Sequence, residues 1–171
     1  MAAEPSLVIE PLGRQHDRTA FDCGIDALNR YIREHAGQDS AKKIAATFVL
    51  TGNRPSAISG YYSLSSTSIN VGELPETAAK KLPRYPLMPA TFIGRLAVDR
   101  NYRGKGCGEL LLADALKRSL VSTRQIGSVA VVVDAIDDRA KGFYGHFQFV
   151  PLEGFSHRLF LPMKAIEVLF S

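Results

Sequence analysis

Apolar residues recur along the chain with two different periods, which predict β-strands and α-helices in turn. Residues 92–98 are rich in β-branched, aromatic and aliphatic side chains, which is typical of a strand that ends at Asp99. Leu112, Leu116 and Leu120 then recur every four residues, which predicts a helix soon after the strand. The other predicted strands lie at residues 7–12, 47–50, 57–65, 128–134 and 158–161.

A further amphipathic helix is predicted from the helical spacing of apolar residues between Ile25 and Ala36. A short helix is expected at residues 74–82, followed by a stiff connector at 83–89, where three prolines remove backbone donors. A short apolar tail is expected after the last strand. Strands that alternate with helices indicate an α/β protein with a mixed sheet.

The composition fits one domain and narrows the possible functions. The chain has 171 residues and a hydrophobic fraction of 46%, which suffices for one sizeable core. No apolar run approaches the roughly 20 residues that span a bilayer, and the first residues lack the features of a leader, so no membrane contact and a cytoplasmic location are expected. Two cysteines and four scattered histidines give no metal-ligand pattern, so no metal is expected.

Between the strand at 92–98 and the following helix lies a glycine-rich basic loop, residues 103–108. It contains Arg103, Gly104, Lys105, Gly106, Cys107 and Gly108. Glycines let the backbone approach a ligand, and the free N–H groups at a helix start favour an anion. The loop has neither the Walker spacing nor the dinucleotide-binding spacing. We therefore expect a pyrophosphate held mainly by main-chain amides, although such a turn can also be a plain strand-to-helix connection.

The loop and the strand before it resemble the acetyl-CoA-binding segment of the GNAT acetyltransferase superfamily. The similarity lies in an Arg-x-x-Gly-x-Gly pattern that follows Ala97-Val98-Asp99. It implies a single GNAT domain over residues 1–171, with a mixed, mostly antiparallel central sheet flanked by helices. It also implies acetyl-CoA as cosubstrate. The cofactor-binding residues it implies are Leu96, Ala97, Val98, Arg103, Gly104, Lys105, Gly106, Cys107, Gly108 and Phe143.

Tyr144 is the candidate catalytic residue. Acetyl transfer from a thioester needs a neutral acceptor amine, donors for the oxyanion and a proton for the departing thiolate. Backbone N–H groups along residues 96–98 could meet the oxyanion, and a phenol with a pKa near ~10 could give the proton. The resemblance supports this role, because many GNAT proteins carry Phe-Tyr at this point of a late helix.

Structural rather than catalytic roles are considered for the residues around Tyr144 and for Cys107. The aromatic residues from Phe143 to Phe149 can be a plain core cluster on a helix that Asp137 or Asp138 caps. His146 is expected to be an exposed helix residue rather than a base. Cys107 is expected to be a buried thiol rather than an acyl carrier.

The N-terminal segment narrows the resemblance to the GNAT toxins of type II toxin-antitoxin modules. Phe21-Asp22-Cys23-Gly24 resembles the opening of that branch, and residues 61–65 and 159–163 are similar to it as well. The branch acetylates the α-amino group of aminoacyl-tRNA, which blocks translation. The resemblance therefore implies a tRNA substrate, a cognate antitoxin that is commonly a ribbon-helix-helix protein, DNA contact only through the antitoxin complex, and a homodimer.

Positive charge is compatible with such a substrate. Lysine and arginine outnumber aspartate and glutamate by 21 to 17, which favours an acidic partner, either a nucleic acid or the phosphates of CoA. Arg95, Arg84 and Lys42 are candidate tRNA-binding residues, although scattered basic residues are usually solvated surface. Two other functions stay possible: acetylation of a small amine or a protein amine, and a non-catalytic CoA-binding or corepressor module.

Overall fold

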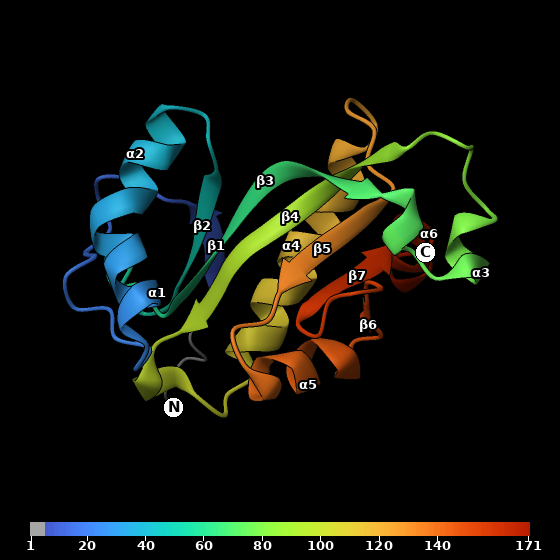
Figure 1. Cartoon of the computed structure of the whole chain (residues 1–171). Coiled ribbons are helices and arrows are strands. Elements are labelled where there is room, and N and C mark those ends of the chain that lie inside the picture. Colours follow the sequence, from blue (N-terminus) through green and yellow to red (C-terminus); the bar gives the residue numbers. More distant parts are fainter. Residues whose placement is uncertain (1–5) are drawn as a thin grey trace. The chain divides into compact units, whose positions relative to one another are not determined.

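The computed structural model describes residues 6–171 as a mixed α/β fold (Figure 1). Within these residues a seven-stranded sheet is flanked by helices. This confirms the predicted fold class. In order across the sheet, the strands are β1 (Val8–Pro11), β2 (Ala46–Thr51), β3 (Gly60–Asn70), β4 (Leu87–Val98), β5 (Ala130–Asp134), β7 (Arg158–Pro162) and β6 (Val150–Pro151).

The strand pairings confirm a mixed, mostly antiparallel sheet. β1 pairs with β2, and β2 with β3, in antiparallel register, and β5–β7 and β6–β7 are also antiparallel. β4 and β5 are parallel, with Thr91 opposite Val131. Residues 52–59 join the antiparallel strands β2 and β3. The connector expected at 83–89 is shorter than predicted, because β4 already begins at Leu87.

The chain divides into two compact units, each with its own core. The first comprises Met1–Ser65 and Arg95–Ala115, and the second Ser66–Gly94 and Leu116–Ser171. Three elements, β3, β4 and the long helix α4, contribute residues to both units. The helical elements are α1 (Asp26–Arg30), η1 (Tyr31–His35), α2 (Ala36–Ala41), η2 (Val71–Glu73), α3 (Glu76–Ala79), η3 (Arg100–Tyr102), α4 (Cys107–Ser122), α5 (Asp138–His146) and α6 (Met163–Leu169).

In the first unit, the predicted amphipathic helix forms with a π-helical middle. α1, η1 and α2 follow one another without a break beside β1 and β2 (Figure 1). Ile32 and Ala36 are fully buried as the periodicity predicts. Ile25 is 38% exposed, however, because it precedes the first helical residue and has an extended backbone. Local π-helical turns are common near functional sites.

Gly60 lets β3 approach its neighbours closely in the first unit. A Cβ atom at this position would come within 2.7 Å of Leu111 Cδ1 and 3.0 Å of the Ala97 carbonyl oxygen. Leu111 is fully buried in α4. Because Ala97 is the second-last residue of β4 and Leu111 lies in the first turns of α4, this contact helps to fix the two elements on either side of the glycine-rich loop.

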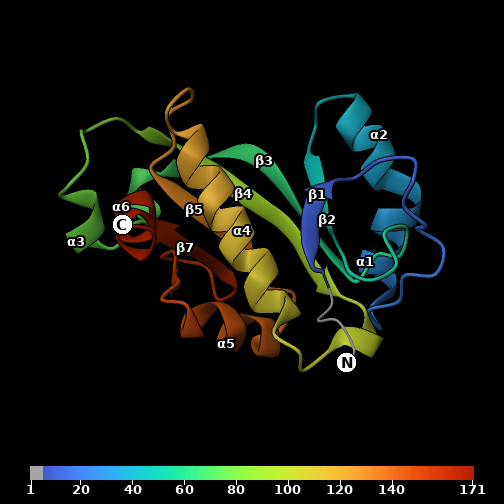
Figure 2. The ribbon, with the colours of Figure 1, turned by 180° about the vertical axis from the view of Figure 1, so that it is seen from behind.

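In the second unit, β5 is the buried central strand. Its residues from Ala130 to Val133 are at most 2% exposed, as expected for an apolar strand covered on both faces. Asp137 caps α5 by accepting a hydrogen bond from the Ala140 N–H at 2.8 Å, which confirms one of the two predicted caps. The expected apolar tail is the helix α6, which packs on β5 and β7 (Figure 2), because Met163 and Ile166 turn inward.

Candidate active site

The glycine-rich loop leads from the end of β4 through the short turn η3 into α4. Gly104 and Gly106 have φ angles of +73° and +77°, the left-handed region that favours glycine. A Cβ atom on either residue would meet no heavy atom within 4 Å, so the outer side of the loop is open. The first backbone N–H groups of α4, from Cys107 onward, have no acceptor within the helix. The loop therefore presents free donors and the positive end of a helix dipole, which suit a phosphate.

The two basic side chains of the loop differ in their contacts. Arg103 donates a hydrogen bond from Nη2 to the Cys23 carbonyl oxygen, so part of its guanidinium is occupied by a bond within the chain. Lys105 Nζ lies 5.3 Å from the ring centroid of Tyr102, within cation–π range. Lys105 therefore keeps its ammonium hydrogen-bonding capacity for an anion, whereas Arg103 shares its own with the chain.

Cys107 is the first residue of α4, and its thiol is buried. The residue is 4% exposed, and burial raises the pKa of the thiol above its ordinary value. A thiolate is the reactive form of cysteine, so this environment disfavours nucleophilic chemistry. The position therefore fits packing beneath the loop, as expected from the sequence.

The end of β4 contains the three residues expected to supply oxyanion donors. Ala97 is 5% exposed, and Leu96 and Val98 are half-buried. Directly after them, the Asp99 N–H donates to the Ser59 carbonyl oxygen at 2.8 Å. This bond fixes the path of the chain where the strand ends and the loop begins.

Tyr144 lies in the last turn of α5 with its ring held by two phenylalanines. Its ring centroid is 5.2 Å from that of Phe143 and 5.4 Å from that of Phe149, both edge-to-face. The side chain is 6% exposed, and burial raises the pKa of the phenol well above its ordinary value. Tyr144 is thus both part of an aromatic cluster and a phenol that stays protonated at neutral pH. His146, on the same helix, is exposed as expected.

The three candidate tRNA-binding residues have different surroundings. Arg95 is half-buried, and its guanidinium carbon lies 3.6 Å from the ring centroid of Tyr31, a close cation–π stack. Arg84 and Lys42 are exposed. A cavity of about 560 Å³ beside α6, lined by Leu120 and Phe170 among others, contains none of the predicted site residues.

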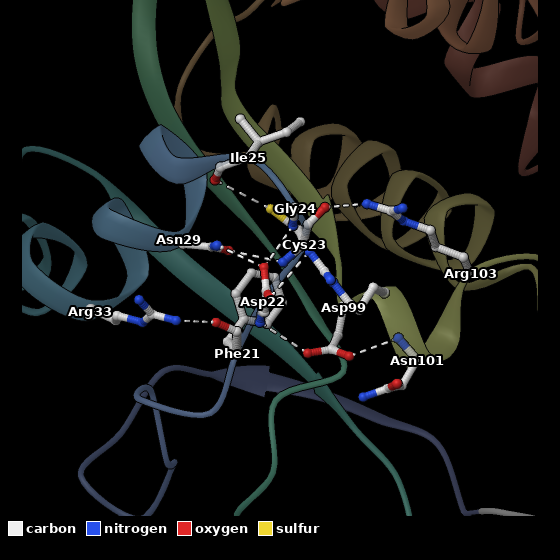
Figure 3. Close-up of polar contacts among 11 residues, drawn as sticks. Phe21, Asp22, Cys23, Gly24, Ile25, Asn29, Arg33, Asp99, Asn101 and Arg103 are labelled. Carbon is white, nitrogen blue, oxygen red and sulfur yellow. Dashed lines mark hydrogen bonds and ion pairs between the residues drawn. The ribbon is translucent and has the colours of Figure 1, made fainter.

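Sequence reasoning missed a polar network around residues 21–24 (Figure 3). The Asp22 N–H donates to Asp99 Oδ2 at 3.0 Å, and the Asp22 carboxylate accepts from the Asn29 amide at 3.0 Å. This hydrogen bond from Asn29 lowers the pKa of the Asp22 carboxyl. The Asp22-Cys23-Gly24 motif marked one end of the network. Its other end, Asp99, belongs to the Ala97-Val98-Asp99 motif, but nothing in the sequence indicated that it contacts a residue 77 positions away.

Residues 6–171 contain neither a metal-binding cluster nor a membrane-spanning helix. No group of three or more histidine, cysteine, aspartate and glutamate side chains in this part of the chain could hold a metal ion. Among the same residues, no helix has both the length and the apolar character needed to cross a membrane.

A β-strand, an open glycine-rich loop and a helix N-terminus in succession beside a mixed sheet are typical of proteins that bind a phosphorylated cofactor. The family model described as acetyltransferase (GNAT) domain matches residues 88–165, which include all of this segment but the first residue of β4, and also α5.

Two curated relatives match over most of the chain. A probable toxin TacT of Sinorhizobium fredii is 32% identical over 95% of this chain and 94% of its own length. A tRNA-acetylating toxin of Mycobacterium tuberculosis is 34% identical over 78% of each chain. The chain belongs to the GNAT acetyltransferase family.

Solved structures of similar proteins have the same fold. AtaT complexed with acetyl-methionyl-tRNAfMet is 34% identical with a TM-score of 0.90, over 97% of this chain and 100% of that one. AtaTR bound with AcCoA is 34% identical with a TM-score of 0.84, over 96% and 98%. An AtaT–AtaR complex bound to DNA is 32% identical with a TM-score of 0.79, over 96% and 99%.

Proposed function

We propose that this protein moves the acetyl group of acetyl-CoA to the α-amino group of aminoacyl-tRNA and thereby blocks translation. Two observations together support the proposal. The loop at the α4 N-terminus is open to a ligand, and the relatives that match most of the chain are named a probable toxin and a tRNA-acetylating toxin. A structure of AtaT in complex with acetyl-methionyl-tRNAfMet supports the substrate class.

The residues present fit acetyl-CoA. The open outer side of Gly104 and Gly106 lets a pyrophosphate approach the main-chain amides of Gly106, Cys107 and Gly108. Lys105 supplies a point charge, and the remaining N–H groups of Arg103 supply further donors. Backbone N–H groups of Leu96, Ala97 and Val98 serve as oxyanion donors, and Phe143 packs against the bound cofactor. When bound, acetyl-CoA supplies the thioester carbonyl on which the acceptor amine acts.

Tyr144 acts as the general acid for the sulfur that leaves. Burial raises the pKa of the phenol, so the hydroxyl carries its proton at neutral pH and gives it up only as negative charge develops on a neighbouring atom. The edge-to-face contacts with Phe143 and Phe149 limit movement of the ring. No strong base is required, because an esterified α-amino group has a pKa below the ~7.7 of an ordinary one, so a substantial fraction of it is already neutral at pH 7.

The acceptor is a polyanion, and three basic residues are proposed to contact it. Arg84 and Lys42 are exposed and available to phosphates. Arg95 is pre-oriented by its stack on Tyr31, which lowers the conformational cost of binding a phosphate or a base. Loss of Arg84 or Lys42 is expected to weaken tRNA binding and to reduce its salt dependence, with no change in acetyl-CoA affinity.

The assembly proposed for this protein follows its relatives. We infer one catalytic domain over residues 1–171, supported by three elements that run through both compact units. We also infer a homodimer and a cognate antitoxin of the ribbon-helix-helix type. DNA contact would come only through that complex, which the AtaT–AtaR complex bound to DNA supports.

The test is mass analysis of the aminoacyl ends of charged tRNA after incubation with purified protein and acetyl-CoA. An acetyl group on the α-amino nitrogen is the expected result, with Tyr144→Phe as the catalytic control and uncharged tRNA as the substrate control. Acetylation of polyamines or protein amines with charged tRNA left unmodified would assign the protein to small-amine or protein-amine chemistry instead. Absence of any acetyl-CoA turnover would favour a non-catalytic module.

A further inference from the structure

Residues 21–24 have no regular structure, yet every backbone polar group from the Phe21 carbonyl to the Gly24 N–H has a partner (Figure 3). Buried backbone groups need such partners, so the contacts show which parts of the chain hold the segment. Three of these hydrogen bonds involve residues close in sequence. Arg33 donates to the Phe21 carbonyl oxygen, the Cys23 N–H donates to the Asn29 side-chain oxygen, and the Gly24 N–H donates to the Asp22 carboxylate.

The other three bonds join this segment to residues 99–103, directly before the glycines of the loop. The Asp22 N–H donates to Asp99 Oδ2 at 3.0 Å, and the Asp22 carbonyl accepts from the Arg100 N–H at 2.9 Å. Arg103 Nη2 donates to the Cys23 carbonyl. The chain therefore attaches the start of the loop to a segment about 80 residues earlier at three successive points.

Asp99 is the centre of this attachment. It is 6% exposed, and its two carboxylate oxygens have separate tasks. Oδ2 accepts from Asp22, while Oδ1 accepts from the Asn101 N–H at 2.9 Å and so caps η3. One buried carboxylate thus fixes both the direction of the turn and its distance from residues 21–24.

Gly24 supports the same interpretation. Its φ angle of +87° favours glycine, and a Cβ atom there would meet Arg103 Nη2 at 3.0 Å and Arg100 Nη2 at 3.5 Å. A Cβ atom at this position would press on the Arg103 guanidinium, which would have to shift by a few tenths of an ångström, whereas the distance to Arg100 is an ordinary van der Waals contact. The segment is shaped to receive the arginines that flank the start of the loop.

We propose that Asp99 is a positioning residue for acetyl-CoA binding: its carboxylate holds the loop at residues 103–108 in its binding conformation by fastening η3 to residues 21–24. The inference rests on the proposed function, in which this loop receives the pyrophosphate. Asp99 acts through the backbone of Asn101 and Asp22 and is not itself a contact of the cofactor.

The matched control is Asn70. Its side chain also caps a short turn, η2, by accepting from the N–H two residues later, at 3.1 Å to Gly72. Within residues 6–171 the Asn70 side chain makes no second hydrogen bond to a distant segment, so Asn70→Ala removes the cap alone. Asp99→Ala removes the cap and the attachment together. Asp99→Asn keeps the shape but supplies one acceptor oxygen for two N–H donors, so one donor faces the amide NH2.

The experiment measures acetyl-CoA affinity by calorimetry, thermal unfolding, and amide hydrogen exchange over residues 100–108 in the ligand-free full chain. We expect Asp99→Ala and Asp99→Asn to weaken acetyl-CoA binding about tenfold, as for one lost charge-assisted hydrogen bond. Exchange over residues 100–108 should accelerate in both variants. The turnover rate at saturating acetyl-CoA should stay within about twofold, since the reacting groups are unchanged. Asn70→Ala should leave affinity and exchange at their wild-type values.

Three outcomes separate the possibilities. Wild-type affinity and exchange in both Asp99 variants would overturn the proposal. Equal loss of affinity in Asn70→Ala would also overturn it, because general destabilisation would then be the cause. If the wild-type protein fails to bind acetyl-CoA, the proposed function falls, while the exchange measurement on ligand-free protein still decides whether Asp99 fixes the loop. Should Asp99→Ala not fold, the isosteric Asp99→Asn carries the test.

Discussion

Replacing Tyr144 by phenylalanine removes one oxygen atom and little else. The ring lies between Phe143 and Phe149, at centroid separations of 5.2 Å and 5.4 Å, and phenylalanine can keep both contacts. Only one oxygen atom is lost, so the change creates no large cavity, and because the residue is 6% exposed it exposes little new apolar surface. Any large loss of activity would therefore come from the missing hydroxyl rather than from altered packing.

The size of the effect follows from the role proposed for that hydroxyl. A positioned general acid contributes about 10²- to 10⁴-fold, equivalent to about 2.7–5.5 kcal/mol of transition-state stabilisation. Because the departing thiolate is protonated only during the chemical step, the loss should fall on kcat and leave the affinity for acetyl-CoA nearly unchanged. A melting temperature close to that of the wild type is expected, which checks that packing is intact.

The pH dependence gives a second test of the same group. Burial raises the pKa of Tyr144, so the phenol loses its proton only at a higher pH than an ordinary tyrosine, whose pKa is near ~10. The rate should rise as the acceptor amine loses its proton between about pH 6 and pH 8, and then stay level to about pH 9. Acetyl transfer to charged tRNA is measured with labelled acetyl-CoA and corrected for spontaneous ester hydrolysis. A kcat for Tyr144→Phe within fivefold of the wild type would refute the reasoning, as would a fall in wild-type rate between about pH 8 and pH 9.

Three further substitutions test the surroundings of the site. Gly60→Ala should cost about 1–3 kcal/mol in urea unfolding, because the new methyl group meets Leu111 at 2.7 Å, whereas Gly127→Ala, with open space around it, should be nearly neutral. Gln148→Gly should stabilise the protein by about 0.5 kcal/mol, because the φ angle of +74° at this position favours glycine; a lower denaturation midpoint would contradict this. Cys107→Ala should keep activity within about threefold. The wild-type thiol should resist iodoacetamide at neutral pH, because burial raises its pKa. Loss of activity on substitution or on iodoacetamide treatment would indicate a covalent role for Cys107.

Local patterns in the sequence predicted the elements on which the site is built. The apolar run ending at Asp99, the glycines at 104 and 106 and the leucine repeat gave strand, loop and helix in the right order, because each signal depends on neighbouring residues. The capping aspartate of α5 was predicted for the same reason. Burial of Cys107 and exposure of His146 also followed the sequence expectation.

Errors arose where the packing of distant residues determines the outcome. Ile25 matches the helical period but is exposed, because the helix begins only at Asp26. The residues after β7 were expected to be an apolar tail, yet Met163 and Ile166 find a partner surface on β5 and β7 and form a helix. Neither result can be obtained from periodicity, since both depend on which surface is available to an apolar side chain.

The glycine-rich loop combines both situations. Its composition predicts a phosphate site, and an interpretation from the local sequence alone gives Arg103 and Lys105 equal roles in binding the phosphates. The folded chain instead uses part of Arg103 to hold Cys23, and it uses Asp99 to hold Asp22. Main-chain amides are weak donors individually and bind a pyrophosphate well only when their directions are fixed beforehand. Residues that fix those directions need not resemble ligands, so a carboxylate, which would repel a phosphate in direct contact, can strengthen its binding from behind the loop.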